Sequence, residues 1–481
     1  MNIKAISRNV GYALLVSALF MLLSIIVSAM NGRDSAFAAL IISFTITFIV
    51  GVFPFIFVRR TSAITLKDGY MIIVLSWLLS FIFGMLPYAL WGGPFTIANA
   101  WFESVSGFTT TGATILDRVE VLPDSLLFWR ASTHFIGGLG VVVFLLLIIP
   151  TDSRMRLRLS NMELSSMSRA GYNTRANKSV SMFAIVYIAL VIISFVSYLL
   201  AGMSPLDAIC HAFSVSATGG FSTRSASIGA FCSRPIEILT MVFMLLSSLH
   251  FGLLYMSVAT RSLRPLNNPV VKFYFSALAI ATVVLAVTLK STGHGISLWE
   301  AAFQTVCVTT TTGFAIVDNA QWPISASAIL LVMGVMCACA GSTSGGVKVD
   351  RVMVGIKSIR RQVLSILHPS SVNEIRLGRR VLSNEEVSTQ VVYMALYALL
   401  LMISVVAALM LGVDTHNAFG ASITSLSNVG PALGELGTMG SFNSIPDAAK
   451  LLYSLDMFLG RIEIYPVLAV LGMVFGGHRG K

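Results

Sequence analysis

Ten apolar stretches, each close to the length of a membrane-spanning helix, constrain this 481-residue chain more than any other feature. A helix needs about 20 predominantly apolar residues to cross the hydrocarbon core of a bilayer. Only 11% of the residues are charged, against roughly 25% in soluble domains. The sequence therefore predicts an all-α polytopic membrane protein with ten transmembrane helices, and it excludes a soluble enzyme. The stretches are Val10 to Met30, Phe37 to Val58, Gly69 to Trp91, Ser125 to Pro150, Val180 to Gly202, Pro235 to Ala259, Val271 to Leu289, Pro323 to about Ala340, Val391 to Val413 and Ala449 to Phe475.

The basic residues predict how the chain is oriented. Cytoplasmic loops carry an excess of Lys and Arg, and assigning alternate loops to the cytoplasm places most of the 32 Lys and Arg residues there. Both termini are then cytoplasmic. The two longest basic loops, Thr151 to Ser179 and Val349 to Gln390, face the same side and offer docking surfaces for anionic lipid or a soluble partner. This pattern accounts for the net charge of +11 without any nucleic acid.

A repeated segment, too short and too polar to cross the bilayer, separates the two spans of each of the last four pairs. Each copy begins with a capping side chain three residues before an Asp, Glu or Asn, at Thr96, Ser204, Ser297 and Asp414. Each copy ends at a glycine, in Thr110-Thr111-Gly112, Ala217-Thr218-Gly219, Thr311-Thr312-Gly313 and Asn428-Val429-Gly430. The glycine follows the cap by 16, 15, 16 and 16 positions. Single caps and turn glycines are common, so four unrelated loops are the alternative, which the near-equal spacing disfavours.

These segments predict four pseudo-symmetric repeats of span, pore helix, filter loop and span around one pore. Non-helical backbone at membrane depth is tolerated only where protein buries it or where it lines a water-filled cavity, and four such loops favour a shared cavity. The predicted units are two extra N-terminal spans in residues 1–66 and the repeats in residues 67–179, 180–269, 270–390 and 391–481.

The loops favour a monovalent cation. A capped helix that stops in mid-membrane directs its partially negative C-terminal end inward, and backbone carbonyls replace the hydration shell of potassium. Glycine lets consecutive carbonyls turn toward the axis. The residues beside the four glycines are neutral, which argues against a divalent-cation filter and against an anion pore. Metal-ligand spacings and phosphate-binding glycine loops are absent from the sequence, so no resident cofactor is predicted.

Four segments resemble those of a known family, the Trk/Ktr/HKT superfamily of potassium transporters. They are Thr109 to Thr114, Thr218 to Thr223, Ser427 to Pro431 and, after the third loop, Ala340 to Lys348. With ten spans, the chain is similar to the bacterial Trk-type membrane subunit. The resemblance implies that glycine in all four loops accompanies a preference for potassium. It also implies a potassium-binding filter formed by Thr110, Thr111, Gly112, Ala217, Thr218, Gly219, Thr311, Thr312, Gly313, Asn428, Val429 and Gly430.

A run of glycines and hydroxyl residues follows the eighth apolar stretch, formed by Gly341, Ser342, Thr343, Ser344, Gly345 and Gly346. The residues alone support two interpretations equally. The helix ends and the run is a cytoplasmic loop, or the run is an irregular segment inside the membrane. The resemblance favours an intramembrane gate below the filter, with Lys348 repelling cations or pairing locally.

Three further features are charged or closely packed. Arg461 lies in the last span, where a charge costs at least ~2.5 kcal/mol. The resemblance makes it a pore-side barrier to cations, and an ion pair with Asp456, Glu463 or another helix is equally supported. Arg130 is interpreted as an interfacial or packing residue. The run from Gly137 to Gly140 predicts a close helix contact.

The sequence thus predicts potassium uptake across the bacterial inner membrane through a gated, channel-like pore. The resemblance implies a homodimer and a cytosolic TrkA-like regulatory subunit that binds NAD or ATP, so that nucleotide acts only through this partner. One alternative is an ion-coupled potassium symporter that uses protons or sodium, for which Glu103 is the main candidate carboxylate. An intramembrane enzyme or an assembly scaffold is the rival from another class.

Overall fold

The computed structural model describes residues 2–59, 65–140, 176–293, 295–370, 373–378, 380–432 and 434–475. The predicted basic loop Thr151 to Ser179 lies outside them up to residue 175, as do residues 141–150 of the predicted span Ser125 to Pro150. The described chain is almost entirely helical. The exception to the all-α prediction is a short antiparallel hairpin of β1 (Arg376–Leu377) and β2 (Arg380–Val381).

Within the described ranges, six apolar segments are long enough to cross a bilayer. They are α1 (Ile3–Met30), α2 (Phe37–Phe57), α3 with α4 (Leu66–Gly84 and Leu86–Trp91), α10 (Ala176–Leu200), α14 (Pro269–Ser291) and α18 (Asn384–Met410). Two bent pairs raise the number to eight if each pair is one span. They are α12 with α13 (Arg234–Ser248 and Phe251–Ala259), bent by 102°, and α20 with α21 (Asp447–Ile462 and Ile464–Phe475), bent by 108°.

The other two predicted spans correspond to shorter helices. The first is α6 (Asp124–Leu139), after which the described residues stop at Gly140. The second is α16 (Ile324–Met336), which has 13 residues and ends before Ala340, the predicted end of this span. Up to eight spans are therefore confirmed by length and composition, and the full set of ten stays a prediction.

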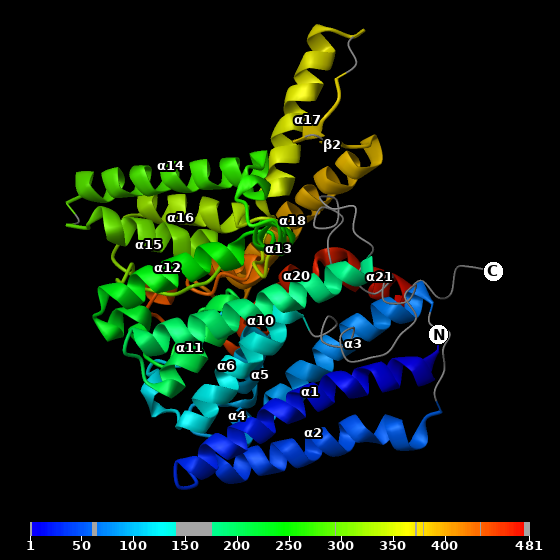
Figure 1. Ribbon diagram of the computed structural model, residues 1–481, viewed down its shortest axis with the longest axis vertical. Coiled ribbons are helices and arrows are strands. Elements are labelled where there is room, and N and C mark those ends of the chain that lie inside the picture. The colour runs from blue at the N-terminus through cyan, green and yellow to red at the C-terminus, as the bar shows by residue number, and fades with distance from the viewer. Residues whose placement is uncertain are drawn as a thin grey trace.

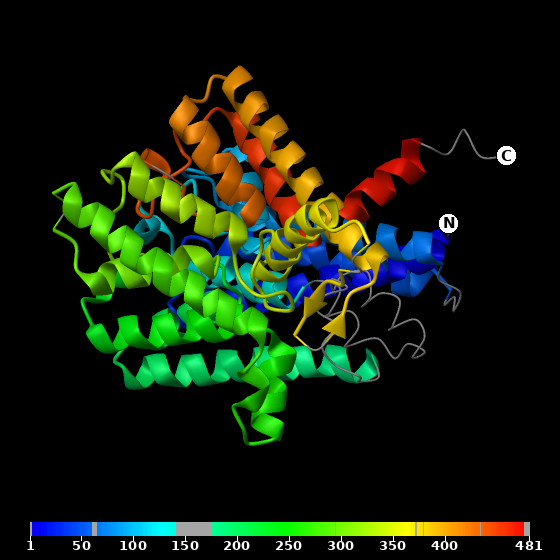
Figure 2. The ribbon, with the colours of Figure 1, turned by 90° about the horizontal axis from the view of Figure 1, so that it is seen from above.

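Four short helices lie between the spans, at the predicted repeat segments. They are α5 (Ile97–Phe108), α11 (Pro205–Ser216), α15 (Leu298–Thr309) and α19 (Thr415–Ser427). Each packs against the spans of its own repeat, as α15 does against α14 and α16, and α5 also packs against α20 at the other end of the chain. Figure 1 shows the resulting bundle, and Figure 2 shows the orange and red C-terminal helices on one side of it and the green helices of the middle of the chain on another.

One helix, α17 (Val349–Leu367), projects beyond the bundle at the top of Figure 1. It exposes a stripe of large apolar side chains three or four residues apart, namely Ile356, Ile359, Val363 and Ile366. The remaining connections are short 3-10 helices, η1 (Val119–Val121), η2 (Ser227–Phe231), η3 (Arg264–Leu266) and η4 (Gly434–Leu436).

Small residues let α6 approach the pore helices, which confirms the predicted close contact. A Cβ atom on Gly137 would lie within 3.0 Å of the Phe108 carbonyl at the end of α5. A Cβ atom on Gly138 would similarly collide with Ala217, at the end of α11. Since a backbone carbonyl has little room to move, this contact requires glycine.

We therefore expect Gly137→Ala to destabilise the protein by about 1–3 kcal/mol through overpacking. The matched control is Gly472→Ala in α21, where the added methyl group meets nothing within 4 Å and improves helix propensity. Thermal unfolding in detergent measures both. Equal melting temperatures for the two variants would contradict the close packing of α6 on the pore helices.

Candidate ion pore

The four pore helices begin in the same way, as their sequences predict. The side chains of Thr96, Ser204 and Ser297 each accept a hydrogen bond from the backbone N–H three residues later, at 3.2, 3.1 and 3.2 Å. Asp414 accepts one from the N–H of His416 at 3.0 Å. These caps satisfy backbone donors that a helix otherwise leaves without partners.

The four helices also end in the same way. Two residues before the loop glycine, a residue adopts left-handed backbone geometry, with φ of 53°, 53°, 60° and 56° at Thr110, Thr218, Thr311 and Asn428. The glycine itself has φ of 82°, 81°, 79° and 89° at Gly112, Gly220, Gly313 and Gly430. Such angles cost little only for glycine. The four loops therefore share one backbone conformation.

This geometry corrects the predicted register of the second loop by one residue. The counterpart of Gly112 is Gly220, not Gly219, so the cap-to-glycine spacing is 16 in all four repeats. Ala217 is the C-terminal cap of α11, with φ of −81°, and so precedes the loop. Two adjacent glycines made the sequence ambiguous, because only the backbone shows that the second has positive φ.

The glycines join the loops into a closed ring. A Cβ atom on Gly112 would strike the Gly219 carbonyl of the second loop, and one on Gly220 would strike the Thr312 carbonyl of the third. In the same order, Gly313 faces the carbonyl of Val429 in the fourth loop and Gly430 that of Thr111 in the first. Every one of these distances is under 3.0 Å. Four equivalent carbonyl-bearing positions thus surround one axis.

Side chains hold the loops from behind. Ser106 donates to the Ala113 carbonyl at 2.6 Å, and Cys307 donates to the Phe314 carbonyl at 2.5 Å, each within its own repeat. The hydroxyls of Thr109 and Thr111 share a hydrogen bond of 2.8 Å, as do those of Thr310 and Thr312. These hydrogen bonds show that the side chains of Thr111 and Thr312 anchor their loops.

The fourth loop is tied to its neighbours through Asn428. Its amide nitrogen donates to the Thr111 hydroxyl at 3.0 Å and to the Met457 carbonyl at 2.9 Å. The first bond crosses from the last repeat to the first. It therefore closes the ring with a side chain as well as with packed backbone.

A buried ion pair, missed in the sequence, supports the first and second loops. Arg130 lies 2.6 Å from Glu103, and both side chains are at most 3% exposed. Glu103 also accepts from the Thr114 hydroxyl and the Ile115 N–H, while Arg130 donates to the Ser222 carbonyl at 3.0 Å. The sequence signal that could have revealed this pair was the presence of two opposite charges in apolar segments of one repeat. Because the two buried charges pair, Glu103 holds the first loop in place. The interfacial interpretation of Arg130 is therefore wrong.

One side of the ring opens into a pocket lined by all four loop glycines with positive φ. Near this mouth, Glu120 accepts hydrogen bonds from the backbone N–H and hydroxyl of Ser225. Burial raises the pKa of the Glu120 carboxyl, but these bonds outweigh burial and hold the pKa below its usual value. The carboxylate therefore stays charged at neutral pH.

The glycine- and hydroxyl-rich run lies directly against the other side of the ring. After α16 ends at Met336, residues 341–347 are buried except Ser342. The Gly345 N–H donates to the Thr311 hydroxyl at 3.2 Å, and the Thr343 hydroxyl donates to the Ser216 carbonyl at 3.1 Å. Of the two interpretations left open, the structure favours a buried segment below the filter over an exposed cytoplasmic loop.

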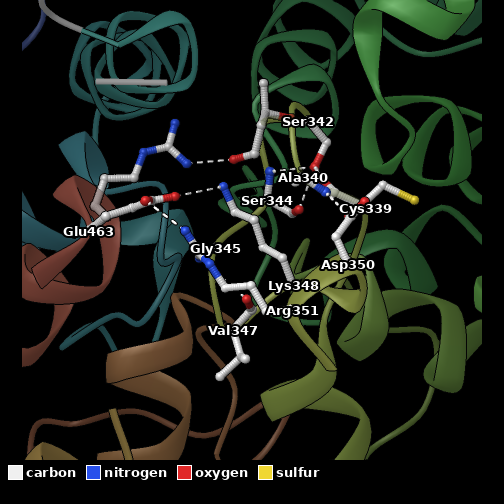
Figure 3. A network of polar contacts seen from close by, with 12 residues as sticks. Cys339, Ala340, Ser342, Ser344, Gly345, Val347, Lys348, Asp350, Arg351 and Glu463 are labelled. Carbon is white, nitrogen blue, oxygen red and sulfur yellow. Dashed lines mark hydrogen bonds and ion pairs between the residues drawn. The ribbon is translucent and has the colours of Figure 1, made fainter. Parts of the chain in front are cut away.

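Charged residues of the last span surround this run (Figure 3). Arg461 donates to the carbonyls of Thr343, Gly137 and Gly138. Glu463, at the break between α20 and α21, pairs instead with Lys348 at 3.5 Å and Arg351 at 2.8 Å. Arg461, Lys348 and Glu463 all line a cavity together with residues 341–345. The gate residues and Arg461 are thus brought together, whereas the pairing of Glu463 with Lys348 was not predicted.

Comparison with known proteins agrees with this geometry. A family profile described as TrkH, cation transport protein, matches residues 36–473. The chain belongs to the TrkH family of cation transport proteins. This confirms the resemblance seen in the loops, and it confirms that the chain is a membrane transport protein and not an enzyme.

The TrkH-family relatives match along the whole chain. The Trk system potassium uptake protein TrkH of Halomonas elongata is 31% identical over 99% of this chain and 99% of its own length. The protein TrkG of Escherichia coli is 31% identical over 98% and 99%. The crystal structure of the potassium transporter TrkH from Vibrio parahaemolyticus superposes with a TM-score of 0.87 at 30% identity, covering 99% of this chain and all of that one.

For this TrkH-family chain we expect Arg130→Ala to lower stability by about 3–5 kcal/mol, because Glu103 would be left buried without a partner. The control is Arg234→Ala, which removes an exposed ion pair with Glu237 (side chain of Arg234 58% exposed) and should cost about 0–1 kcal/mol. Thermal unfolding of the purified proteins measures the difference. Equal losses in the two variants would show that the buried pair does not support the loops.

Proposed function

We propose that this chain takes up potassium across the bacterial inner membrane through a gated, channel-like pore, with both termini in the cytoplasm. The observation that carries the proposal is the closed ring in which each loop glycine packs on the carbonyl of the next loop. Relatives named as potassium uptake proteins match over the full length of the chain, which supports the same function.

The chemistry of the ring suits potassium. Carbonyl oxygens replace a shed hydration shell without the cost of buried carboxylates. We assign ligands to the loops in the corrected register, at Thr110, Thr111, Gly112, Thr218, Gly219, Gly220, Thr311, Thr312, Gly313, Asn428, Val429 and Gly430. The proposed architecture is ten spans, with residues 1–66 in front of four repeats in residues 67–179, 180–269, 270–390 and 391–481.

Residues 341–348 are the proposed gate. They lie directly below the ring, where the Gly345 N–H donates to the Thr311 hydroxyl. The positive groups of Lys348 and Arg461 line the cavity beside them and oppose the passage of cations. The run continues into α17, the helix that projects from the bundle, so a force on α17 reaches the gate. We propose that a cytosolic subunit binding NAD or ATP supplies this force. The exposed apolar stripe of α17 supports the proposed homodimer, since exposed patches mark interaction sites.

Ion-coupled symport is the second candidate. It would need a carboxylate in the membrane that can exchange a proton. Glu103 is occupied by Arg130, but Asp456 in α20 is 4% exposed and is hydrogen-bonded by the neutral Ser404 hydroxyl. Single-channel recording separates the two candidates, because discrete openings that pass many ions per event cannot arise from symport with a fixed stoichiometry.

We expect Gly430→Ala to reduce rubidium uptake at least about tenfold in cells that lack other potassium uptake, since a barrier change of ~1.4 kcal/mol has that effect. The added methyl group would strike the Thr111 carbonyl. The matched control is Gly412→Ala, which has a similar φ of 84° but meets nothing within 4 Å. With equal amounts of protein in the membrane, equal uptake by both variants would contradict the filter.

A second expectation concerns the gate. Glu463→Gln weakens the contacts with Lys348 and Arg351, and basal rubidium flux without the cytosolic subunit should rise roughly fivefold or more, the effect of about 1 kcal/mol on a closed–open equilibrium. The control is Glu374→Gln, which alters an exposed pair with Arg376 on the same side of the protein. An unchanged flux in the Glu463 variant, with normal folding, would remove Glu463 from the gate.

A further inference from the structure

The four repeats differ in how the pore helix holds its own loop. Nine residues before the glycine of positive φ, the pore helices carry Glu103, His211, Gln304 and Ala421. Two residues after that glycine, the loops carry Thr114, Ser222, Ala315 and Ala432. In the first two repeats these two positions are hydrogen-bonded, each at 2.9 Å, from Thr114 to Glu103 and between His211 and Ser222. We call this pair of positions the loop anchor.

In the third repeat the loop anchor has only one polar member. Gln304 is completely buried, and neither its side-chain oxygen nor its nitrogen has a hydrogen-bond partner among the described residues. Its counterpart is Ala315, also buried, which has no polar side-chain atom. Since a buried polar group without a partner is destabilising, Gln304 requires an explanation. The fourth repeat has alanine at both anchor positions, so neither of these two positions carries a polar side chain that needs a partner.

The third loop is instead held beyond its glycine by another repeat. The Ala315 N–H donates to the Ser227 hydroxyl at 3.1 Å, and the Gly229 N–H donates to the Ala315 carbonyl at 3.0 Å. Both partners belong to η2, the short helix after the second loop. The position of the Thr312 carbonyl, three residues before Ala315, thus depends on the contacts with η2, on the Thr310–Thr312 hydrogen bond and on the Cys307 contact rather than on a complete anchor.

We propose that Ala315 limits the ion selectivity of the pore, and that Gln304 is the unmatched half of a loop anchor that a hydroxyl at position 315 completes. The proposal rests on the proposed potassium function. A ring discriminates against sodium by size only when it resists closing around the smaller ion, and one loop with an incomplete anchor lowers that resistance. The side chains of glutamine and glutamate have the same length. A hydroxyl at position 315 would therefore bond to Gln304 as the Thr114 hydroxyl bonds to Glu103.

The test is Ala315→Ser in the purified protein reconstituted into vesicles. Rubidium uptake is measured against rising sodium concentration. The sodium concentration for half-inhibition should rise roughly two- to twelvefold, which corresponds to the ~0.5–1.5 kcal/mol that one added hydrogen bond contributes. The control is Ala432→Ser, which makes the same addition in the fourth loop, where Ala421 offers no partner; it should leave the sodium dependence unchanged.

Two further variants assign the effect to the anchor. The double variant Ala315→Ser with Gln304→Leu should lose the gain in selectivity, because the new hydroxyl then has no amide to bond. Gln304→Leu alone should keep the parental sodium dependence and unfold at an equal or higher temperature, since it removes an unmatched buried amide. This single variant decides the question if Ala315→Ser does not fold.

Three results would overturn the proposal. They are equal sodium dependence in the Ala315→Ser and parental proteins, a gain that persists without Gln304, and a loss of selectivity in Gln304→Leu alone. Failure of the proposed function looks different, because the parental protein would then take up no rubidium in the same vesicles.

Discussion

The structure depends on one contact that is repeated four times, the approach of a loop glycine to the carbonyl of the neighbouring loop. Only a residue without a side chain can bring two backbones this close while adopting positive φ. The contact runs from Gly112 to the second loop, from there to the third and fourth, and back to Thr111. A chain of four non-identical repeats thereby presents equivalent backbone oxygens to one axis.

The surrounding charges and hydroxyls maintain this ring. Backbone that leaves the helical conformation inside a membrane needs other partners, and side chains such as Ser106 and Cys307 supply them. The Glu103–Arg130 pair spans two loops, and its burial means that each charge depends on the other. Below the ring, carbonyls of Thr343 and Gly137 accept from Arg461, so one guanidinium joins residues 341–347 to the first repeat. The ring and this run therefore share a single hydrogen-bonded structure.

Much of this arrangement could be predicted from sequence because it is local. Caps such as Thr96 and Ser297 act within one helical turn, and the spacing from cap to glycine follows from helix length. The features that could not be predicted depend on contacts between distant segments. The choice of Gly220 over Gly219 required the backbone angles. The pairing of Glu463 with Lys348 and Arg351 required the bend of the last span to bring them together.

The central claim is that the four loops hold potassium between them. The most direct measurement is anomalous X-ray scattering from crystals of the protein grown with rubidium as the monovalent cation. We predict a rubidium peak on the axis, bounded by the backbone oxygens of Thr111, Gly219, Thr312 and Val429, which weakens when potassium is added. If the protein transports rubidium but the rubidium peak lies elsewhere, with none inside the ring, the four loops do not hold the transported ion.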